Sequence, residues 1–299
     1  MVADVSLASR PASPRILIAV PVFNEIEHLP TFLPTLRAAV DYDVLFVDDA
    51  STDGTAAVLE GLAGEDGVFL LTHATNGGYG KALIDAFAWA DRRGYDWVIT
   101  LDCDEQHDPA SIPAFVEAIG RDDADLISGT RYLRMPGEDD GDLPPAERRA
   151  VNLILTATIN ELFGWSLTDT FCGFKAHRVR PTIELGLTEN GYAFPMQLWP
   201  RAYAAGLRVS EIPVRRIYND PNRTFGHDVR AGDLDKAQTR LKHYLDVLRD
   251  ELCDLNLKPL RRATAGAAHG AIDALPDTVP GDLRDQLRGG VDVAAAVPC

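Results

Sequence analysis

The sequence is poor in cysteine, in positive charge and in long hydrophobic runs. It has 4 cysteines in 299 residues without a Cys-x-x-Cys pair, so their spacing indicates neither a zinc site nor a framework of disulfides. Its 29 basic residues are outnumbered by 45 acidic ones, and the formal net charge of −16 argues against non-specific nucleic-acid binding. No apolar run approaches the roughly 20 residues that span a bilayer.

The start of the chain offers no targeting signal. Residues 1–14 lack the apolar stretch of a signal peptide, and we expect them to be disordered. The rest has an ordinary globular composition, with 46% hydrophobic and 25% charged residues. We therefore expect a cytoplasmic protein without a nucleic-acid partner, for which peripheral contact with the inner face of the membrane stays open.

Short apolar segments alternate with helical patterns over the first 130 or so residues. Strands are expected at 15–21, 43–48, 68–71, 95–100 and 125–129, and helices at 24–40, 56–63, 81–93 and 112–119. Such alternation with short connections is typical of a sheet of parallel strands between helices. The sequence thus predicts an α/β fold, with a mostly parallel central sheet flanked by helices.

The second half is less regular, and its end carries the weakest signal. Helices are expected at 146–163, 192–205 and 234–255, an extended segment at 169–176 and a strand at 207–214. From 257 to 299 the chain is rich in Ala, Gly, Pro and Asp with little periodicity, which predicts a disordered or loosely packed tail. We therefore expect one domain over residues 15–256.

The apolar stripe of the helix expected at 146–163 is compatible with two placements, on a bilayer surface or in the protein core.

Two aspartates one residue apart follow the strand expected at 95–100. Asp102 and Asp104 thus lie just past a strand's carboxyl end, where open α/β sheets place their ligands. An Asp-x-Asp pair can hold Mg²⁺ or Mn²⁺ through oxygen while substrate phosphates complete the coordination. Taken alone, the pair is also compatible with a solvated turn.

Six segments, in order along the chain, resemble glycosyltransferase family 2. They are Val20–Glu25, Val47–Thr55, Gly78–Ala82, Leu101–Pro109, Ser128–Tyr132 and Asp169–Ala176. The resemblance covers about residues 16–218 and is closest to the polyprenol-phosphate (dolichol-phosphate) mannose synthase-like branch. It implies the GT-A fold of nucleotide-diphospho-sugar transferases. It also implies a metal-dependent, inverting glycosyltransferase with a GDP- or UDP-sugar donor and polyprenyl phosphate as a candidate lipid acceptor.

The resemblance assigns a nucleotide pocket to the first two strand ends. Pro21, Phe23 and Glu25 would line this pocket, and Asp49 and Asp53 would contact the base or ribose. Two of these carboxylates also fit a purely structural role. Asp53 is equally compatible with a helix cap, and Glu25 with an acid in the first turn of a helix.

Two further motifs supply the candidate metal ligands and one basic residue of the donor site. By resemblance, Asp102, Asp104 and Gln106 would bind the divalent cation, Asp104 being essential for catalysis. Lys81 follows a glycine-rich stretch that is not a Walker A motif, because Ala82 stands where Ser or Thr is required. A helix start there can approach an anion, which makes Lys81 a donor-binding candidate. Packing of the helix on the sheet is the alternative reason for the glycines.

The resemblance places three further residues on the acceptor side. Arg131 would bind a phosphate of donor or acceptor, and Arg223 would clamp the leaving diphosphate. Asp169 is the candidate base if the acceptor is a hydroxyl, and a loop-anchoring carboxylate otherwise. After Pro213 the chain departs from the synthase pattern, because the Gly-x-Ser-Lys segment is missing.

Two different functions are compatible with parts of this pattern. A sugar-phosphate nucleotidyltransferase would also use a nucleotide and a metal, but it needs a glycine-rich basic loop after the first strand. Residues 21–25 form no such loop. A non-catalytic nucleotide-sugar-binding protein would bind donor without turnover, and the intact Asp102–Asp104 pair argues against it.

Overall fold

The computed structural model describes residues 13–104, 106–133, 146–215, 217 and 237–295. The disorder expected for residues 1–14 therefore falls almost entirely outside the described residues. Arg223 also lies outside the described residues.

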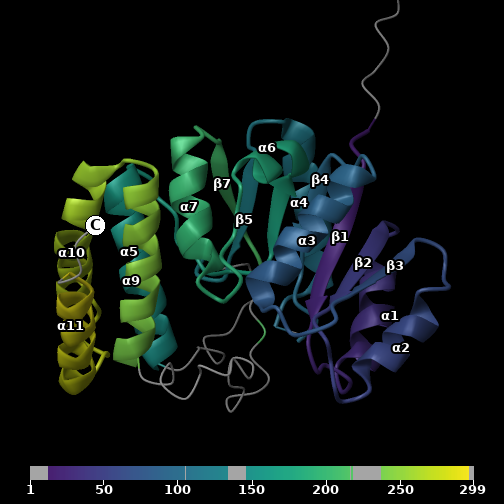
Figure 1. Ribbon diagram of the computed structural model, residues 1–299, viewed down its shortest axis with the longest axis horizontal. Helices are drawn as coiled ribbons and strands as arrows, with labels where there is room; N and C mark the ends of the chain where they lie inside the picture. The colour runs from purple at the N-terminus through teal and green to yellow at the C-terminus, as the bar shows by residue number, and fades with distance from the viewer. Residues whose placement is uncertain (1–12, 105, 134–145, 216, 218–236, 296–299) are drawn as a thin grey trace, which may run out of the picture.

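Seven strands form one sheet in the order β3-β2-β1-β4-β6-β5-β7 (Figure 1). They are β1 (Ile16–Val22), β2 (Asp43–Asp48), β3 (Val68–Thr72), β4 (Trp97–Thr100), β5 (Leu126–Thr130), β6 (Lys175–Arg178) and β7 (Val209–Pro213). Strand β6 pairs antiparallel with both β4 and β5, and every other pairing among the described strands is parallel. The prediction of a mostly parallel α/β sheet is confirmed, and six strands end at one common edge.

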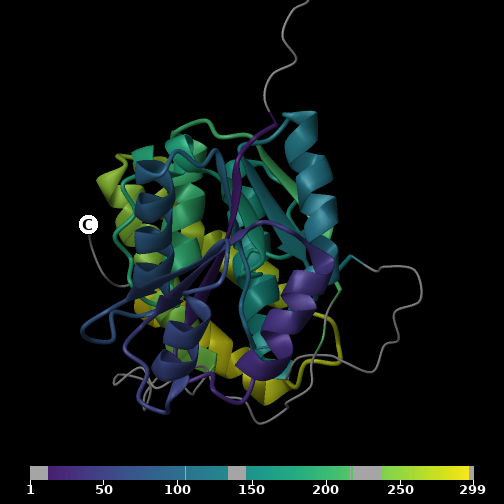
Figure 2. The same ribbon diagram turned by 90° about the vertical axis from the view of Figure 1, so that its right-hand side faces the viewer.

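Helices cover both faces of this sheet because alternate side chains of its strands point to opposite sides. In β1, Leu17 and Ala19 enter one hydrophobic core, while Ile18 and Val20 enter the other. The core that contains Leu17 is covered by α3 (Tyr79–Arg92), α6 (Val179–Glu184) and α7 (Phe194–Ala204). The core that contains Ile18 is covered by α1 (Leu29–Ala39), α2 (Thr55–Leu62) and α4 (Ile112–Arg121). Figure 2 shows α3 on one side of the sheet and α1 and α4 on the other.

Four helices pack together at one end of the molecule (Figure 1). They are α5 (Ala146–Phe163), α9 (Ala237–Asp254), α10 (Lys258–Asp273) and α11 (Gly281–Ala295). The prediction of a disordered or loosely packed tail is wrong for residues 258–295. In α10 the buried residues Thr264, Ala267, Ala268, Ala271 and Ile272 follow helical spacing. Because most are alanines, this face has little apolar contrast in the sequence.

Helix α5 has the bounds that its periodicity predicts, and its apolar stripe is core. Ile154, Leu155 and Ile159 are all 0% exposed in the same hydrophobic core as α9, α10 and α11. Of the two placements open to this helix, the structure therefore supports packing within the protein rather than on a bilayer surface. In the described part of the chain, no helix combines the length and apolarity needed to cross a membrane.

Candidate functional site

Chemically active side chains gather where six strands end. Because β1, β2, β4 and β5 run the same way, the residues that follow them meet at one edge of the sheet. These residues are Glu25, Asp49, Asp102 and Arg131. Strand β6 runs the other way, so its first residue, Lys175, begins at the same edge. Charged residues from five strands therefore lie at one edge of the sheet.

The acidic pair follows β4 as expected, and its surroundings fix Asp102. The Asp102 backbone N–H donates to Nδ1 of His107 over 3.4 Å, and burial lowers the pKa of His107 to about 4. The ring is therefore neutral at pH 7, and its Nδ1 acts as an acceptor. Sequence reasoning missed this buried histidine, although it lies only five residues after Asp102.

Asp104 and Gln106 lie in the same loop. Oδ1 of Asp104 accepts the backbone N–H of Gln106 over 3.1 Å, so Gln106 contacts the carboxylate through its main chain. Within the described residues, no group of three His, Cys, Asp or Glu side chains could hold a metal ion. Two partly exposed carboxylates still fit a hard cation whose remaining ligands are phosphate oxygens and water.

Gly173 presses its backbone against this acidic site from the segment before β6. A Cβ at Gly173 would lie 2.5 Å from Oδ2 of Asp102 and 2.7 Å from the hydroxyl of Tyr79. Burial, followed by the charge of Asp102, holds the pKa of Tyr79 well above its usual range. The glycine in the Asp169–Ala176 motif therefore has a physical reason, since only a residue without a side chain lets the segment lie against Asp102.

Asp49 is buried and supports the loop before α3. Its Oδ1 accepts the backbone N–H of Gly77 over 2.7 Å and lies 2.6 Å from Nδ1 of His73, while Oδ2 accepts from Gly78 over 2.7 Å. His73, which sequence reasoning did not single out, also lies 2.9 Å from the carboxylate of Asp85. The carboxylate of Asp49 thus holds protein groups, and its contact with base or ribose remains a prediction.

The two ambiguous carboxylates differ in their surroundings. Asp53 accepts the backbone N–H groups of Thr55 over 2.9 Å and Ile26 over 3.2 Å, so its carboxylate holds the turn before α2, although the N-cap residue of that helix is Gly54 and not Asp53. Burial raises the pKa of Asp53, but the hydrogen bonds from Thr55 and Ile26 outweigh it and lower the pKa overall. Glu25 precedes α1, which begins at Leu29, so it is not a first-turn acid.

Pro21 and Phe23, the other members of the predicted nucleotide pocket, lie at the end of β1. Both residues are half-buried, so each keeps an accessible part of its side chain at the edge where the strands end. Their contact with a nucleotide remains a prediction.

Lys81 and the glycines before it serve the packing of α3. Nζ of Lys81 lies 2.6 Å from Oδ1 of Asp85, one turn further along the helix. A Cβ at Gly78 would lie 2.5 Å from the carbonyl oxygen of Asn190, and one at Gly80 would lie 2.2 Å from that of Glu189. Close approach of the segment at residues 189–190, rather than packing of the helix on the sheet, therefore explains these glycines.

Arg131 and Asp169 form a bidentate ion pair at the ends of β5 and the neighbouring loop. Nε of Arg131 donates to Oδ2 of Asp169 over 2.7 Å, and Nη2 donates to Oδ1 over 3.1 Å. Asp169 is 0% exposed, and although burial raises its pKa, the charge of Arg131 and the hydrogen bonds lower the pKa to about 2. A carboxylate so held is a poor proton acceptor at neutral pH, which favours the anchoring alternative.

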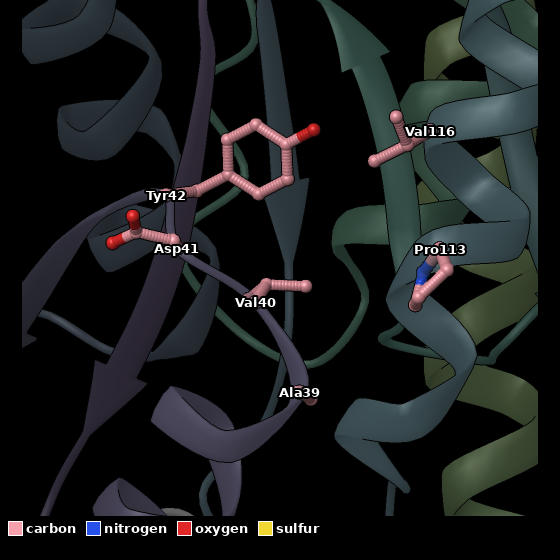
Figure 3. Close-up of a pocket in the computed structure, with 6 residues that line it drawn as sticks. All are labelled: Ala39, Val40, Asp41, Tyr42, Pro113 and Val116. Carbon is pink, nitrogen blue, oxygen red and sulfur yellow. The ribbon is translucent and has the colours of Figure 1, made fainter.

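A separate pocket of about 390 Å³ lies between the end of α1 and helix α4 (Figure 3). It is lined by Ala39, Val40, Asp41, Tyr42, Pro113 and Val116. Asp41 and Tyr42 directly precede β2, and Pro113 and Val116 belong to the first half of α4. It contains none of the predicted site residues.

The sequence matches a known family and resembles two curated proteins over most of their length. The model for glycosyl transferase family 2 matches residues 17–186. An undecaprenyl-phosphate mannosyltransferase from Micrococcus luteus is 37% identical over 227 residues, covering 74% of this chain and 89% of the relative. A polyprenol monophosphomannose synthase from Mycolicibacterium smegmatis is 33% identical over 247 residues, covering 79% and 90%.

Solved structures resemble the fold at low sequence identity. A glucosyl-3-phosphoglycerate synthase from Mycobacterium tuberculosis, in complex with Mn²⁺, UDP and glucosyl-3-phosphoglycerate, has a TM-score of 0.59 at 18% identity, covering 80% of each chain. A mannosyltransferase from Pyrobaculum calidifontis in complex with GDP-Man and Mn²⁺ has a TM-score of 0.54 at 16% identity, covering 96% of this chain and 87% of that one. These two likenesses establish the shared fold.

Proposed function

Because the chain belongs to glycosyl transferase family 2 and is a glycosyltransferase, we propose that it transfers mannose from GDP-mannose to a polyprenyl phosphate with the help of a divalent cation. The observation that carries this proposal is the pair of relatives named for polyprenyl-phosphate mannosylation. They are 37% and 33% identical to this chain over about three quarters of its length. UDP-glucose is the donor to be compared with GDP-mannose.

The acidic pair is the proposed cation site. Asp102 and Asp104 would hold Mg²⁺ or Mn²⁺, which when bound offsets the negative charge of the departing diphosphate. The protein's own part is to keep Asp102 in place, through its backbone bond to His107 and the close contact with Gly173. From the end of β5, Arg131 would bind the phosphate of the acceptor.

The surroundings of Asp169 also favour a phosphate acceptor over a hydroxyl. In an inverting transfer an acceptor oxygen bonds to the anomeric carbon while the bond to the diphosphate oxygen breaks, its electron pair leaving with the diphosphate. A hydroxyl acceptor needs a base to take its proton, and Asp169 is committed to Arg131. A phosphate acceptor is already ionised and needs no such base.

The two alternative functions have less support. The family match and the names of both curated relatives favour glycosyl transfer over nucleotidyl transfer. They equally favour an enzyme over a non-catalytic nucleotide-sugar-binding protein.

The proposal is tested by incubating the protein with labelled GDP-mannose or UDP-glucose, polyprenyl phosphate and Mn²⁺. We expect label from GDP-mannose in the lipid fraction, and background label with Asp104→Asn. Asp108→Asn is the matched control, because it removes the same charge from the same loop at a residue whose Oδ1 accepts from Ala110 N–H. Hydrolysis of the donor without lipid-linked sugar would show that the acceptor is wrong.

Calorimetry separates the cation site from the acceptor. We expect Mn²⁺ to strengthen GDP binding to the unsubstituted protein, and to have little effect on GDP binding to Asp104→Asn. Equal Mn²⁺ dependence in both proteins would contradict the assignment of Asp104 as a metal ligand.

A further inference from the structure

Helix α5 places a buried asparagine against the Arg131–Asp169 pair. Asn152 is 7% exposed, and its Nδ2 donates to Oδ1 of Asp169 over 2.9 Å and to the hydroxyl of Tyr132 over 3.3 Å. Asn152 therefore touches the carboxylate that holds Arg131 and the tyrosine that follows it. Nothing in the sequence singles this residue out, because its partners lie 17 and 20 residues away.

The ionised carboxylate of Asp169 fixes which way the Asn152 amide points, because it can only accept hydrogen bonds, and a chain of hydroxyl groups completes the network. Oγ1 of Thr156, one turn further along α5, donates to Oδ1 of Asn152 over 3.0 Å. Oγ1 of Thr156 also accepts the backbone N–H of Thr170 over 3.2 Å and lies 2.9 Å from the hydroxyl oxygen of Thr170. Since Thr156 has one proton to donate, the hydroxyl of Thr170 donates to Thr156. The NH₂ group of Asn152 therefore faces Asp169, and its oxygen faces Thr156.

Both carboxylate oxygens of Asp169 accept hydrogen bonds, and these bonds hold the carboxylate that in turn fixes the guanidinium of Arg131. Besides Arg131 and Asn152, the carboxylate accepts the backbone N–H of Phe171 over 3.1 Å. Arg131 binds it side-on through Nε and Nη2, which turns the edge carrying Nη1 away from Asp169. The Arg131 side chain remains 21% exposed, at the edge of the sheet where the acidic pair lies.

We propose that Asn152 is a positioning residue for the acceptor phosphate: it holds Asp169 and Tyr132 so that Asp169 fixes the guanidinium of Arg131 in its phosphate-binding orientation. The inference rests on the proposed function, in which Arg131 binds the phosphate of the acceptor. Planar, bidentate recognition of phosphate depends on orientation as well as charge, so an arginine that can turn loses part of its advantage.

The first test is kinetic. Asn152→Leu, close in volume but without hydrogen bonds, should raise the KM for polyprenyl phosphate on the order of tenfold while the KM for GDP-mannose stays unchanged. Asn160→Leu is the matched control on the same helix. Its side chain bridges α5 to Leu167 through two hydrogen bonds of 2.7 and 2.9 Å, neither of which involves Arg131, Asp169 or Tyr132. This control should leave both KM values unchanged.

A double-mutant cycle tells positioning from general damage. If Asn152 acts through Arg131, then Asn152→Leu should have no further effect on the acceptor KM in an Arg131→Lys background. Thr156→Val removes the hydroxyl that orients Asn152 and should change the acceptor KM in the same direction, which keeps the test available if Asn152→Leu does not fold. Additive effects of Asn152→Leu and Arg131→Lys would overturn the inference.

Side-chain NMR tests the positioning without turnover. The Nε–H signal of Arg131, assigned by its absence in Arg131→Lys, should exchange slowly with water in the unsubstituted protein and in Asn160→Leu. It should exchange at least tenfold faster in Asn152→Leu or Thr156→Val. Unchanged exchange in a folded Asn152→Leu would overturn the inference. If polyprenyl phosphate is not a substrate at all, the proposed function fails, while the exchange measurement still decides whether Asn152 holds Arg131.

Discussion

Replacing Gly173 by alanine should damage the acidic site while sparing the fold. The added Cβ would lie 2.5 Å from Oδ2 of Asp102 and 2.7 Å from the Tyr79 hydroxyl. Gly173 is not among the residues with positive φ, so alanine can adopt its backbone conformation. The strain therefore falls on the two side chains that meet the new methyl group.

The size of the effect follows from these distances. Non-bonded contact between heavy atoms is comfortable near 3.5 Å, so the Asp102 carboxylate must move by about 1 Å. A displacement of that size at a reacting centre costs on the order of 10²-fold in rate. We expect a loss of similar order in kcat/KM for mannosyl transfer, together with weaker Mn²⁺-dependent GDP binding.

The control for this assay is a glycine-to-alanine substitution whose added methyl group contacts no other residue. Gly120→Ala in α4 is suitable, because a Cβ there has nothing within 4 Å, and this variant should keep full activity and Mn²⁺ dependence. Both variants should unfold cooperatively in thermal melts. A Gly173→Ala enzyme with unchanged kcat/KM and unchanged Mn²⁺ dependence would refute the reasoning that close contact with Gly173 keeps Asp102 in place for the cation.

Three further predictions concern stability. Ile159→Ala should lower the free energy of unfolding in urea by about 2–5 kcal/mol, because Ile159 is 0% exposed in α5, and a change below about 1 kcal/mol would contradict its core position. Gly266→Ala in α10 should raise that free energy by about 0.5–1 kcal/mol, since the Cβ meets nothing, and destabilisation would argue against an ordered α10. The pKa of Asp169 in the folded protein is about 2, below its ordinary value of 3.8. The ionised carboxylate therefore stabilises the fold fully at pH values above 3.8, and this stabilisation is lost as the pH falls toward 2. Unfolding followed from pH 5 to 2 should therefore show a flatter decline for Asp169→Asn than for the unsubstituted protein, and equal slopes would contradict the depressed pKa.

The sequence determined the elements whose signal is local. Helix α5 has the predicted bounds, 146–163, because its apolar residues repeat at the helical period. The position of the acidic pair could also be predicted from a local signal, because the strand before it is a short apolar run that ends at Thr100. Family membership followed from motif order, which also needs no knowledge of distant contacts.

Other features could not be predicted because their causes lie far apart in the chain. The role of Asp169 depends on Arg131, 38 residues earlier, and no local pattern distinguishes a free carboxylate from one that a guanidinium already holds. Likewise, Gly80 is required by the Glu189 carbonyl oxygen, which only the folded chain brings to it.

The ordered tail shows the same division between local pattern and tertiary structure. Its alanine-rich helices have little apolar contrast, and a short helix of that kind is marginal by itself in water. They become stable where Ala268, Ile272 and Leu287 are buried against α5 and α9, at 0% exposure. Periodicity in the sequence therefore indicated helix or strand only where the apolar contrast is strong, and it missed α10 and α11. Burial against distant partners decided which segments are held in place and which polar side chains remain available for chemistry.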